Sequence, residues 1–145
     1  MISQISIKIK KLHPSAVIPE YGTDNAAGCD FYSIEEHVFL PGETYAIKTG
    51  VAMEIPEGKA LFIWDRSGMG LKGFHRFAGL IDSDYRGEIR IVLHNASGNN
   101  FKISKHDKIA QGVFQDYYQA DFKEVSELSE TLRGSGGFGD RKSVV

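Results

Sequence analysis

Short runs of strand-forming residues, separated by turn sequences, recur along the whole chain and strongly constrain its fold. The turn sequences include Pro41-Gly42, Pro56-Glu57-Gly58 and Ser97-Gly98-Asn99-Asn100. No long amphipathic helical period lies between the runs, so parallel strands joined by crossover helices are excluded along most of the chain. We therefore expect an all-β sandwich or barrel with strands within residues 5–9, 29–33, 38–40, 45–55, 60–64, 79–81, 88–93 and 109–117.

Two of these runs alternate in the way of strands with one buried face. The earlier run places on one face Val51, Met53 and Ile55. The later run places on one face Ile89, Ile91 and Leu93. Because the chain has 145 residues, it is long enough to bury a core of this kind and short for two domains, so we expect one domain.

The charge balance argues against bulk electrostatic binding of polyanions. Lys and Arg number 17 and Asp and Glu number 19, which leaves a net charge of −2. Such a chain has no overall positive field for nucleic acid or an anionic membrane, so we expect no direct contact with either. Any anionic ligand must then be bound by a local site.

The sequence is typical of a soluble protein of a reducing compartment. The single cysteine, Cys29, cannot form an intrachain disulfide or a multi-cysteine zinc site. The N-terminal residues alternate apolar and polar types, which does not resemble the apolar core of a signal peptide. Apolar runs such as residues 60–64 are far too short to span a membrane. We therefore predict a cytoplasmic location.

Two pattern matches are rejected. Residues 68–73 fit G-x-G-x-x-G, but the glycine-bounded stretch that follows is too short for the helix that a dinucleotide site requires. Residues 82–87 begin like a calcium loop, yet Arg86 occupies a ligand position and Leu93 replaces the bidentate Glu. The five histidines also show no metal-ligand spacing.

Residues 79–89 are interpreted as a hairpin with a short, charged connection. Asp82 directly follows two apolar residues, so a carboxylate at the end of a buried strand is predicted to be rigid and partly desolvated, as a general base requires. On spacing alone, a turn cap is the more common role for such an Asp. Asp84 and Glu88 are expected to be solvated.

Two further segments carry groups that suit a phosphate. The string Asp65-Arg66-Ser67-Gly68 offers a guanidinium, a hydroxyl and successive backbone N–H groups after an apolar strand. The alternative role for Ser67 is the N-cap of a short helix. Gln111 lies in an otherwise apolar strand, so its amide is either satisfied by backbone or directed at a ligand.

The last residues differ in kind from the rest. In residues 133–139 the glycines leave Phe138 as the only large apolar group, and ordering such a backbone is costly. We predict a mobile tail, which in most proteins would be dispensable.

Together, five strings resemble the five ordered motifs of the homotrimeric deoxyuridine triphosphate pyrophosphatases (dUTPases). They are Ala26-Ala27-Gly28-Cys29-Asp30-Phe31, Asp65-Arg66-Ser67-Gly68-Met69, the segment of residues 79–88, Asp107-Lys108-Ile109-Ala110-Gln111, and the segment of residues 133–139. Five matches in order are far more specific than any one of them, so the separate alternatives above lose their force.

The resemblance implies a jelly-roll-like β domain over residues 1–132 and a flexible, glycine-rich arm over residues 133–145 that completes a neighbouring active site in a homotrimer. It implies hydrolysis of dUTP to dUMP and pyrophosphate with Mg²⁺. That reaction limits uracil incorporation into DNA and supplies dUMP for thymidylate synthesis.

The resemblance also implies a role for each matching position. Asp82 is similar to the base that activates water for attack on the α-phosphorus. Asp30 is similar to the acidic residue that supports Mg²⁺ through water, the ion being held mainly by the triphosphate. Tyr85 is similar to the ring that packs on deoxyribose and excludes a 2′-hydroxyl. The remaining implied substrate contacts are Arg66, Ser67, Gly68 and Gln111 toward the phosphates, the backbone at Phe77, Gly79 and Leu80 toward uracil, and Arg133, Gly137 and Phe138 in the arm.

Three departures from the family pattern stand out. Cys29 replaces a bulkier residue, and Arg76 stands where some relatives carry a small polar one. After Phe138 the chain continues with Gly139-Asp140-Arg141-Lys142 instead of Gly-Ser-Thr-Gly.

The related dCTP deaminases need an acid further along the strand after the third motif, and Ile89-Arg90-Ile91-Val92-Leu93 offers none. A regulatory protein that binds dUTP and a protein partner is the other alternative.

Overall fold

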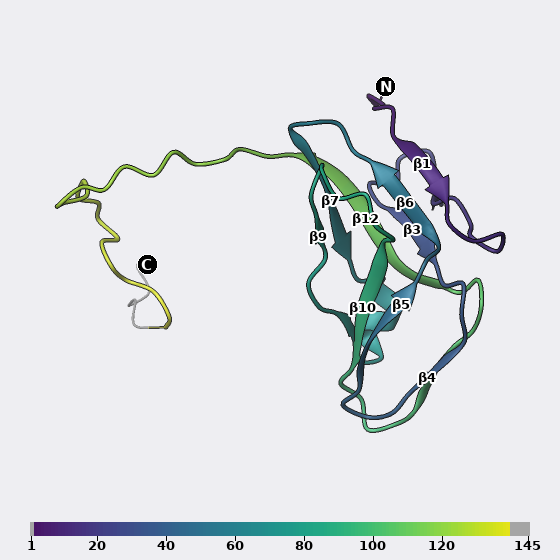
Figure 1. The fold of residues 1–145 in the computed structure, drawn as a ribbon. Helices are drawn as coiled ribbons and strands as arrows, with labels where there is room; N and C mark the ends of the chain where they lie inside the picture. The colour runs from purple at the N-terminus through teal and green to yellow at the C-terminus, as the bar shows by residue number, and fades with distance from the viewer. Residues whose placement is uncertain (1, 140–145) are drawn as a thin grey trace.

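The computed structural model describes residues 2–139, and their regular structure consists of short strands and one short helix (Figure 1). The elements are β1 (Lys8–Lys11), β2 (Glu20–Tyr21), β3 (Cys29–Tyr32), β4 (His37–Phe39), β5 (Thr44–Lys48), β6 (Val51–Glu54), β7 (Lys59–Trp64), α1 (Ser67–Leu71), β8 (Phe74–Arg76), β9 (Leu80–Ile81), β10 (Arg90–Asn95), β11 (Phe101–Ile103) and β12 (Lys108–Asp116). The all-β class predicted from the turn spacing is confirmed.

The largest sheet has five strands in the order β2-β3-β12-β7-β9, and a second sheet has the order β5-β10-β8. Two further pairs are formed by β1 with β6 and by β4 with β11. Every pairing is antiparallel. The sheets do not close into a barrel, so a layered arrangement replaces the barrel alternative.

The core lies between these layers and is rich in Phe and Ile. The predicted inward face of β10 is confirmed, because Ile89, Ile91 and Leu93 are each at most 2% exposed. The core passes so close to β12 that only glycine fits at residue 112, where a Cβ atom would lie 2.7 Å from both Leu61 and Phe31 side-chain atoms. The sheet that carries the site is therefore packed tightly beneath its centre.

Two sequence interpretations are wrong. The predicted strand over residues 45–55 is broken between β5 and β6, where Gly50 adopts a left-handed φ of 71°. The predicted hairpin over residues 79–89 does not form, because β9 pairs with β7 while β10 pairs with β5 and β8. Residues 82–89 instead cross from one sheet to the other, which alternation within each strand cannot reveal. Strands β2, β8 and β11 and the short helix α1 were not predicted.

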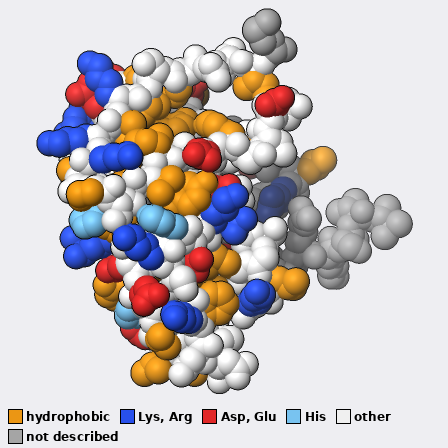
Figure 2. Space-filling view, turned by 90° about the vertical axis from the view of Figure 1, so that its right-hand side faces the viewer, with side chains coloured by type: hydrophobic (Ala, Val, Ile, Leu, Met, Phe, Trp, Pro, Cys, Tyr) orange, Lys and Arg blue, Asp and Glu red, His pale blue; other side chains and the backbone are white. Residues whose placement is uncertain are grey.

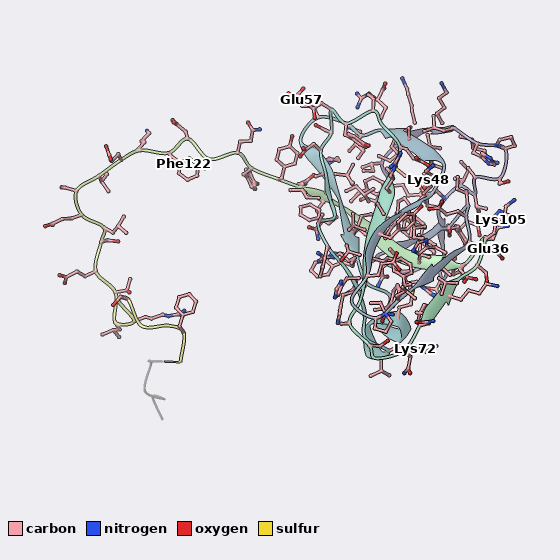
Figure 3. All side chains as sticks on the ribbon, turned by 60° about the horizontal axis from the view of Figure 1, so that its bottom comes forward. Glu36, Lys48, Glu57, Lys72, Lys105 and Phe122 are labelled. Atoms are coloured by element: carbon pink, nitrogen blue, oxygen red, sulfur yellow. The ribbon has the colours of Figure 1, made fainter. Side chains whose placement is uncertain are left out.

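The last strand ends at Asp116, and residues 117–139 contain no helix or strand. This C-terminal segment projects away from the sheets (Figure 1), and Phe122 on it points into solvent at 92% exposure (Figure 3). The predicted boundary between residues 132 and 133 stays a prediction. The departure at Asp140, Arg141 and Lys142 lies outside the described residues.

Candidate active site

The centre of β12 brings together residues from three of the five motif strings. Gln111 lies opposite Asp30 of β3 on one side and opposite Trp64 of β7 on the other. Directly opposed residues of antiparallel strands project to the same face of a sheet. The first and fourth motif strings therefore meet on one face, and Trp64, which directly precedes the second string, lies on the same face.

Asp30 is the acidic centre of this group. Its side chain is 15% exposed and lies between two cations, with Arg66 Nε 3.5 Å from Oδ1 and Lys108 Nζ 3.6 Å from Oδ2. The Arg66 guanidinium also donates to the Lys108 carbonyl at 3.5 Å. Asp30, Arg66, Lys108 and Gln111 are called the Arg66 cluster below. Because two of its members are half-exposed cations and one is an anion, the cluster leaves positive charge available to an anionic ligand.

Gln111 is held by backbone in this structure. Its Nε2 donates to the Asp65 carbonyl at 2.9 Å. On the other side it packs against Gly28, where a Cβ atom would lie only 2.6 Å from Gln111 Oε1. The glycine of the first motif string is therefore required so that β3 can approach the amide of the fourth.

Ser67 and Gly68 begin α1 and are exposed beside the Arg66 cluster. The N-cap residue of α1 is Arg66, whose side chain makes no cap hydrogen bond. The alternative in which Ser67 caps this helix is therefore wrong, and its hydroxyl faces solvent. A Cβ atom at Gly68 would have no neighbour within 4 Å, so the space above the turn is open.

A second group surrounds Asp82, at the other end of β7. In the edge strand β9, Leu80 lies opposite Phe62 and Ile81 lies opposite Leu61. The same register continued by one residue places Asp82 beside Ala60. The carboxylate lines an open cleft of about 780 Å³ together with Leu80, Phe62 and Tyr117. Asp82 is exposed, so the partial desolvation expected from its apolar neighbours is not provided by this chain alone.

The ring of Tyr85 is fixed at the rim of the Asp82 group. Its hydroxyl donates to the Glu88 carbonyl at 2.7 Å. A Cβ atom at Gly87 would lie 2.5 Å from this hydroxyl oxygen, so the ring folds back over a glycine. Glu88 is itself held by the Gly50 N–H at 3.0 Å and by Arg90 at 3.2 Å. Glu88 was expected to be solvated; instead it is part of this support.

The turn at Phe77, Ala78 and Gly79 lies between the two groups in sequence. Phe77 donates its N–H to the Val92 carbonyl at 2.8 Å, and the Gly79 carbonyl accepts from the Ile63 N–H at 2.8 Å. The Phe77 side chain stacks on His94 with ring centroids 4.7 Å apart. The turn is thus attached to both large sheets.

The two groups are far apart within one chain. Asp82 lies beside Ala60 and Arg66 follows Trp64, so the distance between them spans β7, about 20 Å at the rise of an antiparallel strand. In the arm, Arg133 Nε donates to the Gly136 carbonyl at 2.9 Å. Gly137 belongs to the same segment, and Phe138 is fully exposed.

The described residues hold no preformed metal cage. Among residues 2–139, no three His, Cys, Asp or Glu side chains come together as ligands.

Cys29 is 3% exposed, and burial raises the pKa of its thiol above the ordinary value of 9.0. The thiol is therefore protonated and uncharged at neutral pH.

Three contributors were not assigned by sequence reasoning. Lys108 pairs with Asp30, Asp65 accepts from Gln111, and Gly28 makes room for it. All three stand within the motif strings, so a cation on the strand of Gln111 and a glycine beside Asp30 were the available signals.

Acidic and basic side chains are interspersed over the face of the molecule seen in Figure 2. Within the described residues, no helix is long and apolar enough to cross a membrane.

A family model and curated relatives both match this chain to dUTPases. The dUTPase family model matches residues 15–141. Deoxyuridine 5′-triphosphate nucleotidohydrolases of Nautilia profundicola and Helicobacter pylori are 48% and 43% identical over 140 residues, covering 93% of this chain and 97% and 95% of theirs.

The solved structures agree with the sequence relatives. A Staphylococcus bacteriophage 80alpha dUTPase with dUPNHPP has a TM-score of 0.88 at 29% identity, covering 97% of this chain and 100% of that one. A mutant dUTPase from phage phi11 of S. aureus, described with a structural Mg(II) ion, has a TM-score of 0.79 at 28% identity, covering 85% and 98%. Since the family model and these relatives extend over nearly its whole length, the chain belongs to the dUTPase family.

Proposed function

We propose that this protein hydrolyses dUTP to dUMP and pyrophosphate in the cytoplasm. The observation that carries the proposal is that the motif strings fold into two open groups, one cationic around Arg66 and one bearing the exposed carboxylate of Asp82. A water molecule activated by Asp82 attacks the α-phosphorus. The β- and γ-phosphates leave as pyrophosphate.

Each group supplies a different part of this chemistry. The Asp82 carboxylate is unpartnered by any described side chain and reaches solvent, so it can accept a proton from water at the moment of attack. The guanidinium of Arg66, the hydroxyl of Ser67 and the amide of Gln111 offset negative charge as the α–β bridge breaks. The exposed N–H groups around Gly68 add donors at the same place.

The binding of base and sugar is assigned to the third motif string. The backbone at Phe77, Gly79 and Leu80 reads uracil through main-chain donors and acceptors. The Tyr85 ring packs on the deoxyribose, where a 2′-hydroxyl would clash, so ribonucleotides are excluded sterically. The hydrogen bond from Tyr85 to the Glu88 carbonyl supports this role, because it keeps the ring in one place.

Mg²⁺ fits this site as an ion carried mainly by the substrate. Mg²⁺ is commonly held by one or two carboxylates together with phosphates and several waters. Asp30 provides one such carboxylate beside the cations that bind the phosphates, and the described residues offer no larger ligand set. When bound, the ion would neutralise charge on the departing pyrophosphate.

The distance between the two groups supports a shared site. A water activated by Asp82 and a phosphate bound by Arg66 must lie within a few bonds of one another. The two groups are about one strand length, roughly 20 Å, apart in one chain. We therefore propose a homotrimer in which each site combines the Asp82 group of one chain, the Arg66 cluster of a second and the arm of a third, with Phe138 stacking on uracil and Arg133 and Gly137 meeting the phosphates.

Pyrophosphate release tests the proposal. With Mg²⁺ present, dUTP should be turned over strongly in preference to dCTP, dTTP and UTP, and chelation of the metal should stop turnover. Release of ammonia from dCTP would instead indicate a deaminase, which the absence of an acid in Arg90–Leu93 argues against. Light scattering should give three times the chain mass of 16.1 kDa.

A further inference from the structure

The turn at Phe77, Ala78 and Gly79 has an unusual backbone. Ala78 has a φ of 58° and Gly79 a φ of 109°. Left-handed backbone is unfavourable for an alanine, because its Cβ atom crowds the following carbonyl. Such residues persist only where the surrounding structure holds them, and they gather at functional sites.

In addition to the backbone bonds of Phe77 and Gly79 to the two sheets, the side chain of Arg76 contacts the turn. Its Nη1 donates to the Ala78 carbonyl at 2.9 Å. Its guanidinium carbon lies over the Trp64 ring, 5.2 Å from the centroid. The Arg76 side chain also lies beside Gly79: a Cβ atom there would lie 3.4 Å from Arg76 Cδ and 3.2 Å from two Ile63 atoms. The guanidinium therefore covers the left-handed turn and is itself fixed by stacking.

The backbone of Arg76 is attached to the phosphate side of the site. The Asp65 carboxylate accepts the Arg76 N–H at 2.6 Å, and the Asp65 carbonyl accepts from Gln111. The Nε atom of Arg76 is buried and has no hydrogen-bond partner among the described residues. Leaving a buried donor unpaired is costly. The guanidinium nevertheless adopts the orientation in which Nη1 donates to Ala78 and Nε has no partner.

The contact with Ala78 fixes the direction of the next N–H group. In a trans peptide the C=O and N–H point in opposite directions. With the Ala78 carbonyl directed at Arg76, the N–H of Gly79 must point to the other side of the turn. Neither Ala78 N–H nor Gly79 N–H makes a hydrogen bond within residues 2–139. The turn thus presents free donors on an exposed face.

We propose that Arg76 is a positioning residue that orients the Ala78–Gly79 peptide and thereby favours uracil over cytosine. This inference rests on the proposed function, in which that backbone reads the base. A peptide N–H pairs with a carbonyl oxygen of uracil, whereas cytosine carries an amino donor in place of one of these oxygens. Without Arg76 the peptide can rotate and present the Ala78 carbonyl, which accepts from an amino group.

Arg76→Ala and Arg76→Lys test this role, with Lys102→Ala on β11 as a control for loss of an exposed cation. In Arg76→Ala, the KM for dUTP should rise about tenfold while kcat stays within about twofold, because the lost contact orients the base and not the water. The preference for dUTP over dCTP in kcat/KM should fall about tenfold. Arg76→Lys should restore part of the affinity for dUTP and part of the preference for dUTP over dCTP, since the lysine ammonium can still donate to the Ala78 carbonyl.

A purely structural role predicts a different pattern. A lowered Tm with unchanged KM and unchanged base preference in both Arg76 variants would overturn the proposal, and so would a fall in kcat alone. Trp64 is the only tryptophan, so its emission reports the stacking directly. Arg76→Ala should shift that emission to longer wavelength, and Lys102→Ala should not.

Binding of dUMP and dCMP, followed by Trp64 emission, separates this inference from the proposed function. If the native protein failed to hydrolyse dUTP, the proposed function would be wrong, yet the relative affinity for dUMP and dCMP would still respond to Arg76. Equal dUMP preference in native protein and Arg76→Ala would overturn the role of Arg76 whatever the activity.

Discussion

The side-chain amide of Gln111 joins two motif strings by donating to the Asp65 carbonyl at 2.9 Å. Gly28 packs against the other side of that amide, where no Cβ atom fits. The same Asp65 holds the backbone of Arg76. The position of the Gln111 amide, which we propose binds phosphate, therefore depends on a glycine from the first string and on Asp65, which also anchors the backbone of Arg76.

Gly28→Ala should displace the Gln111 amide and weaken substrate binding. The added methyl group would lie 2.6 Å from Oε1, and loss of the Asp65 contact leaves a part-buried polar group unpaired. We expect the KM for dUTP to rise about tenfold, the effect of one lost hydrogen bond. Gly98→Ala is the matched control, because a Cβ atom there meets nothing within 4 Å. Equal KM values for the two variants would contradict this account.

Asp82→Asn should lower turnover by about two to four orders of magnitude, the usual scale for a general base. The amide has nearly the same size, so binding of dUMP should be retained. Steady-state kinetics and equilibrium titration of the same preparation measure the two quantities. Near-native turnover in Asp82→Asn would exclude Asp82 as the base.

The fold could be predicted from the sequence where the signal was local. The alternation of Ile89, Ile91 and Leu93 identified a buried face correctly, because each strand fixes its own periodicity. Pairing between strands is not local, which explains why residues 79–89 were misinterpreted as a hairpin. Both strand-like ends of that segment exist, but they belong to different sheets.

Site residues could be predicted from the sequence where they lie within the contiguous motif strings. Asp30, Arg66 and Gln111 were each singled out, and the structure brings them together. Lys108 and Gly28 are visible in the motif strings as a cation and a glycine, but their contacts, like those of Arg76 with Trp64 and Ala78, form only in the folded chain. Their roles could therefore not be assigned from the sequence. The burial of Asp82 was overestimated, since β9 is an edge strand.

Gly87→Ala should displace the ring of Tyr85. The added Cβ atom would lie 2.5 Å from the phenol oxygen, so the ring must move off the position set by the Glu88 carbonyl. If this ring excludes the 2′-hydroxyl, Gly87→Ala and Tyr85→Ala should both narrow the preference for dUTP over UTP. Tyr85→Phe keeps the ring and should keep more of the preference. Unchanged selectivity in Tyr85→Ala would show that another group reads the sugar.

Stability should fall at alkaline pH because the folded chain disfavours ionisation of Cys29. Burial raises the pKa of this thiol above 9.0, whereas the unfolded thiol ionises near its ordinary value. The unfolded state therefore binds fewer protons than the folded state above pH 9, and the free energy of unfolding decreases as pH rises. Comparison of Tm between pH 8 and pH 10 should show a smaller decrease in Cys29→Ala. An equal decrease in both proteins would assign the effect to other groups.

Subunit mixing tests whether one site is built from several chains. Asp82→Asn chains and chains truncated before Arg133 should each be inactive alone, the first without a base and the second without an arm. In one chain these parts lie apart, since the arm projects away from the sheets that carry Asp82 (Figure 1).

If different chains supply the base and the arm, random exchange of equal amounts should restore about a quarter of the sites, because each part comes from an intact chain half of the time. Exchange is verified by native mass spectrometry of the mixed oligomers. If one chain supplied both parts, every site would lack one of them, and no activity would return at any mixing ratio. The recovered fraction therefore distinguishes a shared site from a self-contained one, and its dependence on the mixing ratio should peak at equal amounts.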